Sequence, residues 1–257
     1  MKIAVLSDIH ANLPALQAVL EHARRQEVED RWNLGDSVGY GPFPDEVVQL
    51  IRKQNILSIS GNYDRKVLKV KHKIKQWKEE KAPEKWLSFQ WAFDHLTQEN
   101  RRFLKYLPEQ RLIHLAGWKI LLVHASPDSP KEHLGPDTPL ERLQELAQIA
   151  QADMVLCGHS HQPFARQAGH TWFINPGSVG RPDDGDPRAA YTILDLRKHS
   201  LDITPVRIDY NIREAVAAIR EKGLPEDFAR MLIAGRDLNT VQAVTGTDTD
   251  SQDHPHS

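Results

Sequence analysis

Cysteine is almost absent from this sequence, since Cys157 is the single thiol among 257 residues. A lone cysteine cannot form an intrachain disulfide, which excludes a small disulfide-stabilised secreted domain and suits a reducing cytosol. Long apolar runs are also missing, and without about 18 consecutive apolar residues no bilayer-spanning helix is expected. The chain passes from Leu6 directly into Asp8 and His10, without the apolar region of a signal peptide. We therefore expect a cytoplasmic protein that does not enter a membrane.

An excess of charge of one sign is missing as well. The 33 Lys and Arg residues against 35 Asp and Glu residues give a net charge of −2. This balance argues against a chain that attracts polyanions over its whole surface. Hydrophobic residues at 40% and charged residues at 26% are ordinary for a globular protein. We find no internal repeat, and the length suffices for one sizeable core.

The first 60 residues alternate between strand and helix patterns. Short apolar runs predict strands at residues 3–6, 31–34 and 56–60. Apolar residues at helical spacing predict helices at residues 13–26 and from Pro44 to Ile51. Such a strand–helix–strand–helix–strand opening is typical of a parallel sheet with crossover helices.

Residues 65–108 are predicted to be a helical insertion of a different character. Residues 65–85 contain nine Lys or Arg and three Glu, a net charge of +6. Basic residues interleaved with Trp77 and Trp86 would suit a nucleic-acid backbone. We favour the alternative, in which the basic face is solvated and the tryptophans pack on the body or on a second subunit. Nucleic acid and a homo-oligomer stay open as partners.

The second half of the chain returns to strands. Hairpins are predicted within residues 111–123 and 164–174, and a further strand pair within 191–208. Helices at about 211–235 close a single domain that we place at residues 1–240. The polar residues 241–257 are expected to form a disordered tail.

Polar side chains suited to metal binding follow the predicted strands. In an α/β sheet, the loops beyond the carboxyl ends of the strands form the ligand crevice. Buried Asp residues need partners, and clustered His and Asp suit divalent metals. Packing alone does not explain why so many donors follow separate strands. The candidates are Asp8, His10, Asp36, Asn62, His124, His159 and His161.

Five ordered motifs carry a family resemblance. They are Asp8-Ile9-His10, Gly35-Asp36, Gly61-Asn62-Tyr63-Asp64, Val123-His124-Ala125 and Gly158-His159-Ser160-His161. Together they resemble the calcineurin-like metallophosphoesterase superfamily, in particular its bacterial and archaeal phosphodiesterase-like branch. The resemblance implies an α/β fold, a four-layer αββα sandwich of two mixed β-sheets flanked by helices, here with a helical cap insertion.

The resemblance also implies the arrangement of the site. One metal is held by Asp8, His10 and His161; the other is held by Asn62, His124 and His159; Asp36 bridges both. Two divalent ions are implied, and Mn is the first choice because carboxylate and mixed N/O ligation accepts it. Fe, Zn and Ni stay open, since the ligand types do not separate them. A hydroxide between the metals attacks phosphorus directly. The catalytic residues are then Asp36, Asn62, Tyr63 and His124, and the substrate-binding residues are Asn62, Tyr63 and Arg65.

Tyr63 departs from the commonest family pattern, which has His after the metal-binding Asn. Tyrosine is a poorer proton donor at neutral pH, and this favours phosphodiesters as substrates. A phosphomonoesterase, acting on small molecules or on proteins, is the alternative on the same site. A scaffold whose catalysis has faded is the alternative of another class. A nuclease is a third option that rests on the basic segment alone. Arg181 is a further phosphate-binding candidate, although a solvated loop charge is the more common role.

Overall fold

The computed structural model describes residues 1–198 and 200–249. Its first sheet contains the N-terminal strands, and the strands of this sheet lie in the order β10-β9-β1-β2-β3. β1 pairs in parallel with β2, which pairs in parallel with β3, and β1 is antiparallel to β9. The parallel opening is as predicted, although the third strand is shorter than expected. The bounds are β1 (Lys2–Leu6), β2 (Asp30–Asn33), β3 (Leu57–Ser58), β9 (Ala189–Arg197) and β10 (Ser200–Ile208).

The second sheet has the order β4-β5-β6-β8-β7. Its central strands β5, β6 and β8 are parallel, while β4 and β7 each join their neighbour in an antiparallel hairpin. Both sheets are therefore mixed. The bounds are β4 (Gln110–Leu115), β5 (Trp118–Val123), β6 (Met154–Leu156), β7 (Phe164–Ala168) and β8 (Thr171–Asn175).

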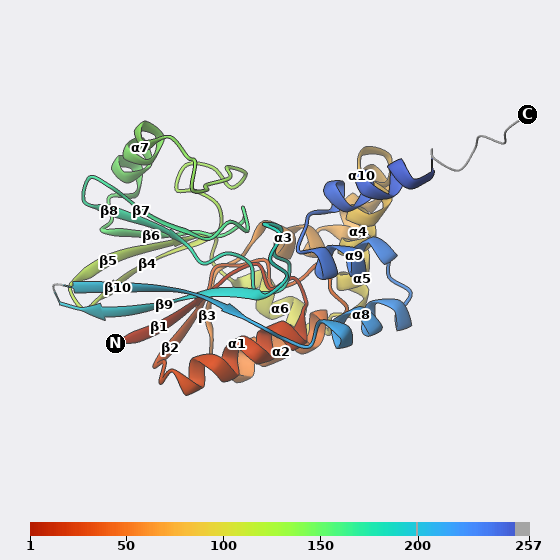
Figure 1. The fold of residues 1–257 in the computed structure, drawn as a ribbon, viewed down its shortest axis with the longest axis horizontal. Helices are drawn as coiled ribbons and strands as arrows, with labels where there is room; N and C mark the ends of the chain where they lie inside the picture. Colours follow the sequence, from red (N-terminus) through yellow and green to blue (C-terminus); the bar gives the residue numbers. More distant parts are fainter. Residues whose placement is uncertain (199, 250–257) are drawn as a thin grey trace, which may run out of the picture.

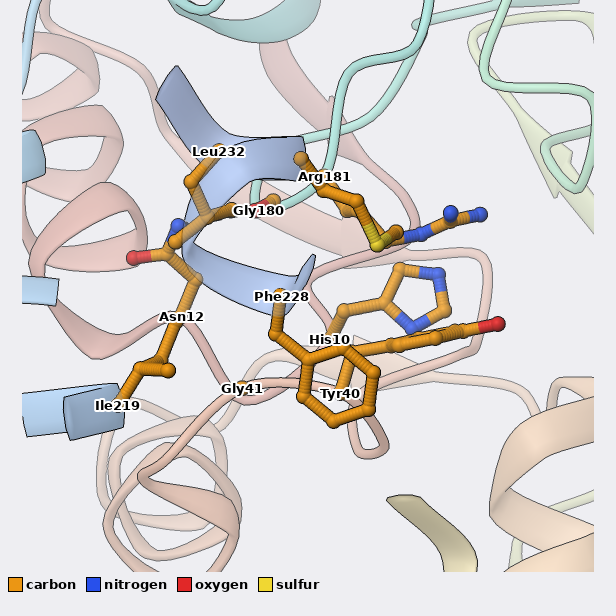
Figure 2. A pocket seen from close by; sticks show the side chains of 10 residues that line it. His10, Asn12, Tyr40, Gly41, Gly180, Arg181, Ile219, Phe228 and Leu232 are labelled. Atoms are coloured by element: carbon orange, nitrogen blue, oxygen red, sulfur yellow. Dashed lines mark hydrogen bonds between the residues drawn. The ribbon is translucent and has the colours of Figure 1, made fainter. Parts of the chain in front are cut away.

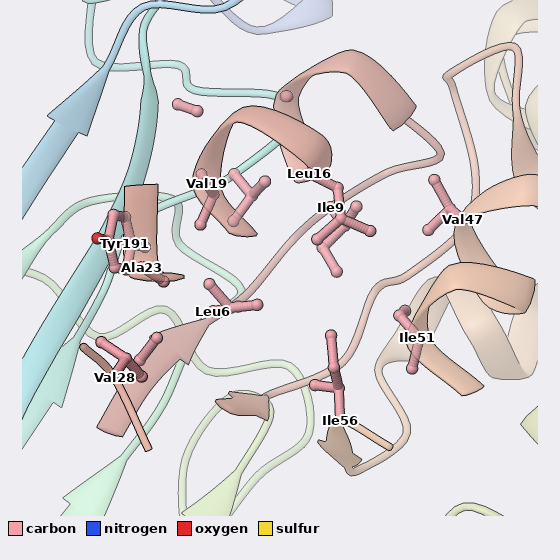
Figure 3. Close-up of a cluster of buried hydrophobic side chains, with 14 of the residues drawn as sticks. Leu6, Ile9, Leu16, Val19, Ala23, Val28, Val47, Ile51, Ile56 and Tyr191 are labelled. Atoms are coloured by element: carbon pink, nitrogen blue, oxygen red, sulfur yellow. The ribbon is translucent and has the colours of Figure 1, made fainter. Parts of the chain in front are cut away.

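The alternation of side chains along β1 explains the layering of the two sheets. Ala4 and Leu6 face α1 (Leu13–Arg25) and α2 (Pro44–Lys53), where Leu6 belongs to the apolar cluster shown in Figure 3. Ile3 and Val5 point the other way, into a core shared with the second sheet. The outer face of the second sheet is covered by α7 (Leu140–Ala150) (Figure 1). The predicted four-layer α/β sandwich is therefore confirmed.

Four helices follow β3 in the stretch where a cap was expected. They are α3 (Asn62–Leu68), α4 (Val70–Glu80), α5 (Pro83–His95) and α6 (Gln98–Tyr106). Lys69 lies between α3 and α4, so the start of the predicted helical insertion is divided between two helices. Trp77 is buried and packs edge-to-face on Phe89 at 5.2 Å, while Lys78 lies over the Trp86 ring. The Trp77 side chain thus serves packing inside the cap.

Three C-terminal helices lie beside α4 and α5 (Figure 1): α8 (Ile212–Glu221), α9 (Glu226–Ala234) and α10 (Leu238–Thr249). The helix α10 corrects the expectation of a disordered tail from residue 241, and the rest of that tail, residues 250–257, lies outside the described residues. Leu238 and Val241 are buried in the cluster that α8 and α9 form around Phe228. Within the described ranges, no helix is long and apolar enough to cross a bilayer.

Candidate metal centre

The seven predicted metal ligands lie on loops at the carboxyl ends of the strands, apart from Asn62, which begins α3. Loops at this edge of a parallel sheet converge, as the sequence analysis assumed. The ligands come after β1 (Asp8, His10), after β2 (Asp36), at the start of α3 (Asn62), after β5 (His124) and after β6 (His159, His161).

The first donor group consists of Asp8, His10 and His161, whose ligand atoms lie within 4.8 Å of one another. Asp8 Oδ1 lies 3.2 Å from His161 Nε2 and 3.9 Å from His10 Nε2, and the two Nε2 atoms are 3.3 Å apart. Asp8 Oδ2 accepts hydrogen bonds from Ser7 Oγ and His159 N, whereas the buried Oδ1 has no hydrogen-bond partner among the described residues. An oxygen and two ring nitrogens thus converge with space for a cation.

The second donor group consists of Asp36, His124 and His159, which also lie within 4.8 Å of one another. Asn62 joins it, since its Oδ1 is 2.9 Å from His124 Nε2. Asp36 Oδ2 lies 3.3 Å from His124 Nε2 and 4.0 Å from His10 Nε2. This carboxylate oxygen therefore stands between the two donor groups.

Backbone carbonyls fix the orientation of two imidazoles. His124 Nδ1 donates to the Leu34 carbonyl oxygen at 2.8 Å, and His161 Nδ1 donates to the Arg181 carbonyl oxygen at 2.8 Å. A carbonyl oxygen only accepts, so Nδ1 carries the hydrogen in both rings. With Nδ1 engaged in this way, the Nε2 atom of each ring faces the donor group, the orientation that metal-ligating histidines usually have.

The backbone of this site is in an unusual conformation. Non-glycine residues rarely adopt positive φ, and such conformations cluster at functional sites. The loops that carry the ligands are also tightly packed: a Cβ on Gly158 would lie 1.9 Å from Ser7 Oγ. Positive φ occurs at five of the seven ligands, namely Asp8 (54°), His10 (47°), Asp36 (52°), His159 (68°) and His161 (57°).

Burial and nearby charges shift the pKa values of the imidazoles. Burial and the positive charge of Arg181 lower the pKa of His10 to about 3. Burial and His124 lower the pKa of His159 to about 4. Burial would also lower the pKa of His124, but the Asp36 carboxylate outweighs it and raises the value to about 9. At neutral pH, His10 and His159 are therefore unprotonated and able to ligate.

The carboxylates keep their negative charge despite burial. Burial alone would raise the pKa of Asp8, yet His161 holds it well below its usual range. Burial would likewise raise the pKa of Asp36, which His124 holds down. Buried carboxylate oxygens beside neutral imidazole nitrogens are a donor set for divalent transition metals. The unpartnered Asp8 Oδ1 shows that these residues fit such an ion.

A cavity of about 550 Å³ opens beside the donor groups. It is bounded by the metal loops, by the cap and by the segment that leads into α10. Its wall carries both positive and negative side chains. The polar residues that line it outside the predicted ligand set include Tyr40, Tyr63, Lys66, Lys85, His133, Gln162, Arg181, Asp183, Asp237 and Asn239.

Tyr63 lies directly beside the first donor group. Its ring packs edge-on against His10 at 5.2 Å, and its backbone N–H donates to Asp36 Oδ1 at 2.6 Å. The Tyr63 and Tyr40 hydroxyls are hydrogen-bonded at 2.8 Å. Burial raises the pKa of Tyr63 well above its usual value. The Tyr63 hydroxyl is therefore protonated at neutral pH and can donate a hydrogen bond, but it does not readily release its proton.

Arg65, the predicted phosphate-binding arginine, lies outside this cavity. Its Nη1 is 3.0 Å from Glu109 Oε2, and it lines a separate hollow of about 230 Å³ that also reaches His124. Arg181 lines the main cavity instead. The sequence pattern gave no means of choosing between the two arginines, because the choice depends on which way each loop turns.

A small apolar pocket of about 10 Å³ connects the C-terminal helices to the metal loops (Figure 2). Asn12 Nδ2 donates to the Gly180 carbonyl oxygen at 2.8 Å on one side of it. On the other side, Phe228 of α9 packs edge-to-face on Tyr40 at 5.1 Å. The C-terminal helices thus support Tyr40, and through it the Tyr63 hydroxyl.

Sequence reasoning did not assign the cavity residues contributed by distant segments. Lys66 follows Asn62 by four residues and therefore lies on the same face of α3, a signal that was available. His133, Asp237 and Asn239 had no such signal, because each reaches the cavity only through the tertiary fold.

The fold and the donor set together define a metal-dependent hydrolase of phosphoester bonds. The chain belongs to the calcineurin-like phosphoesterase superfamily, whose domain matches residues 1–199. It is 36% identical over 251 residues to the uncharacterized protein MJ0912 of Methanocaldococcus jannaschii, covering 91% of this chain and 98% of that one.

Two further relatives agree with this family. The phosphodiesterase YfcE of Escherichia coli K12 is 27% identical over 206 residues, which cover 76% of this chain and 88% of YfcE. The crystal structure of a metallophosphoesterase from Sphaerobacter thermophilus is similar with a TM-score of 0.76 and 31% identity. That match covers 91% of this chain and 100% of the other.

Proposed function

We propose that this protein hydrolyses phosphodiesters with two divalent metal ions, of which Mn²⁺ is the first to test. The position of Asp36 Oδ2 between His124 Nε2 and His10 Nε2 carries the proposal. A carboxylate placed there can serve two cations at once. In this proposal Asp8, His10 and His161 hold one ion, Asn62, His124 and His159 hold the other, and Asp36 bridges them.

When bound, two such ions supply a nucleophile at neutral pH and neutralise charge on the phosphate. The protein's own residues then orient the ester. The Tyr63 hydroxyl, held by Tyr40 at 2.8 Å, donates a hydrogen bond to a phosphate oxygen. The Asn62 amide stands at the same edge of the cavity and contacts the substrate as well.

A covalent phosphoenzyme is not part of the proposal. Ser178 is fully buried, and its hydroxyl donates to the Asp8 carbonyl oxygen at 2.7 Å. Cys157 is fully buried too, and burial raises the pKa of its thiol above the ordinary range. Among the described residues, the hydrogen bonds of both side chains are with backbone groups, so neither has a base that would activate it as a nucleophile. The proposal is therefore direct attack of water on phosphorus.

The preference for diesters rests on Tyr63. A monoesterase that expels an alkoxide benefits from a group that protonates the leaving oxygen, and the raised pKa of Tyr63 makes it a poor donor of a whole proton.

Hydrolysis of bis-p-nitrophenyl phosphate and p-nitrophenyl phosphate tests this proposal directly. The protein is treated with chelator, then assayed with and without added Mn²⁺. We expect turnover to depend on the metal and kcat/KM for the diester to exceed that for the monoester. Faster monoester hydrolysis would favour a phosphatase. No hydrolysis of either ester with any divalent metal would favour a binding scaffold.

A further inference from the structure

His133 lies in the wall of the main cavity, directly beside the second donor group. Its ring is tilted against the ring of His159, with the two ring centres 4.4 Å apart. On the side of the first donor group, the ring of Tyr63 packs on His10 in a comparable way. His133 and Tyr63 line the same cavity. Each donor group therefore has one further polar side chain next to one of its imidazoles.

The residue before His133 is held by a network of charged side chains. Arg142 Nε of α7 donates to Glu132 Oε1 at 2.7 Å, and Ser126 Oγ donates to Glu132 Oε2. Arg142 also forms an ion pair with Asp128 at 2.6 Å. These contacts tie the loop between β5 and α7 to the helix that follows it.

The residue after His133 is held as well. Leu134 is buried in the apolar cluster between α7 and the second sheet. Its carbonyl oxygen accepts a hydrogen bond from Ser160 Oγ. Ser160 itself stands between the ligands His159 and His161 in the sequence. Because both neighbours of His133 are fixed, its backbone has a defined position beside His159.

The ring nitrogens of His133 are available to a ligand. Within the described part of the chain, neither nitrogen has a hydrogen-bond partner, and the exposed side chain faces the cavity. His124 and His161 differ, since each uses Nδ1 on a backbone carbonyl oxygen. A neutral imidazole has one N–H donor and one acceptor nitrogen. His133 can therefore donate a hydrogen bond to a molecule that enters the cavity.

We propose that His133 is a substrate-binding residue that donates a hydrogen bond to an oxygen of the phosphate ester. The inference rests on the proposed function, because the ester must lie at the donor groups. His133 belongs to neither set of converging donor atoms, so the geometry points to the substrate and not to an ion. Tyr63 contacts the ester from the side of the first donor group, and His133 contacts it from the side of the second.

Three substitutions at His133 separate a substrate contact from packing on His159. His133→Phe keeps a ring and loses both nitrogens, whereas His133→Asn and His133→Gln keep an N–H near the positions of Nδ1 and Nε2. With Mn²⁺-loaded protein and bis-p-nitrophenyl phosphate, we expect His133→Phe to lower kcat/KM about tenfold, since it loses a charge-assisted hydrogen bond. At least one of the two amide variants should recover most of that loss.

His170→Phe is the matched control, because His170 is exposed in the turn between β7 and β8. That turn lies at the end of β8 opposite to the metal loops, so kcat/KM should equal the wild-type value. Unchanged kcat/KM in His133→Phe would overturn the proposal, and so would equal losses in all three His133 variants. Metal content is measured on the same samples. Less bound metal in His133→Phe would show that the ring supports His159 instead, and would also overturn the proposal.

Binding of inorganic phosphate tests the contact without turnover. In calorimetry with Mn²⁺-loaded protein, we expect His133→Phe to bind phosphate about tenfold more weakly than the wild type, and His170→Phe to bind it equally well. If no ester is hydrolysed, the proposed function fails, and this comparison still decides on His133. Equal affinity in the wild type and His133→Phe, or no phosphate binding by the wild type, would contradict the assignment of His133.

Discussion

The Asp36 carboxylate lies between the two donor groups. Its Oδ1 accepts from the Tyr63 backbone N–H, and its Oδ2 faces His124 and His10. The Asp36 side chain therefore holds the backbone of Tyr63 and also faces both candidate ion positions. A change at Asp36 should affect metal content and turnover together.

Asp36→Asn is expected to lower turnover at least about 100-fold. Loss of a residue that only supports a metal ligand already costs up to about 100-fold, and loss of the ligand itself should cost more. The amide has no negative charge and only one oxygen with which to bridge. Metal analysis of the purified protein should show less bound metal, and kinetics with Mn²⁺ should show the loss of turnover. Asp202→Asn, at an exposed position of β10, should behave as the wild type. Wild-type activity in Asp36→Asn would contradict the bridging role.

Tyr63→His is expected to shift the preference toward monoesters. An imidazole near the substrate protonates a leaving oxygen more readily than a tyrosine, and general acid catalysis is worth about 100-fold or more where geometry allows. The measurement is the ratio of kcat/KM for an alkyl phosphate monoester, whose alkoxide must be protonated as it leaves, to that for the bis ester. Tyr63→Phe, which keeps the ring on His10, should retain bound metal. An unchanged ratio in Tyr63→His would contradict the interpretation that Tyr63 causes the preference for diesters.

At the scale of elements, the sequence predicted most of the strands and helices but missed α10. β1 and α1 could be predicted because the first is a short apolar run and the second has apolar residues at helical spacing throughout. Residues 238–249 contain threonines, a glycine and an aspartate, which favour helix weakly. Burial of Leu238 and Val241 against the preceding helices stabilises α10 in spite of that.

In the candidate site too, some residues could be predicted from local sequence and others depend on the tertiary fold. The convergence of the candidate ligands could be predicted because each follows a strand or opens a helix within a recognisable motif. Arg181 and Lys66 could not be assigned to one cavity, because 115 positions separate them in the sequence. Only the packing of the cap and the 176–188 loop around the tyrosines brings them together. Arg65, which was predicted to bind the substrate, instead lies at ion-pair distance from Glu109.

Phe228→Ala tests the contact between α9 and the site. The side chain is almost fully buried against Tyr40, so its removal should lower the free energy of unfolding by about 3–5 kcal/mol. Urea unfolding measures this. Ile233→Ala on the same helix is the control, because its exposed side chain predicts a change within about 0.5 kcal/mol. Equal stability of the two variants would show that α9 does not support Tyr40 as described.

For the whole molecule, bound metal should contribute to stability. Ions that bind the folded chain alone stabilise it by mass action. We expect chelator to lower the Tm by about 5–10 °C and added Mn²⁺ to restore it. Differential scanning calorimetry measures the shift, and in Asp36→Asn the shift should be smaller. A Tm that does not respond to chelator would contradict the assignment of these donors.

The stability of the metal-free protein should fall as the pH is lowered from about 6.5 to 4. The folded pKa of His159 is about 4, below the ordinary value near 6.5, so in this interval the unfolded state binds more protons. Protonation of the unfolded chain therefore reduces the free energy of unfolding. Urea unfolding at pH 7 and pH 5 should show a smaller difference in His159→Gln than in the wild type. His170→Gln, in an exposed turn, should leave the difference unchanged.

The position of β9 has a consequence for synthesis of the chain. β1 emerges from the ribosome first, but its antiparallel partner, residues 189–197, follows nearly 190 positions later. At about 5–20 residues per second, β1 waits about 10–40 s for that partner. Until then the apolar segment at residues 3–6 has an open edge that can pair wrongly or be held by a chaperone. The first sheet therefore reaches its described strand order only after most of the chain has been synthesised.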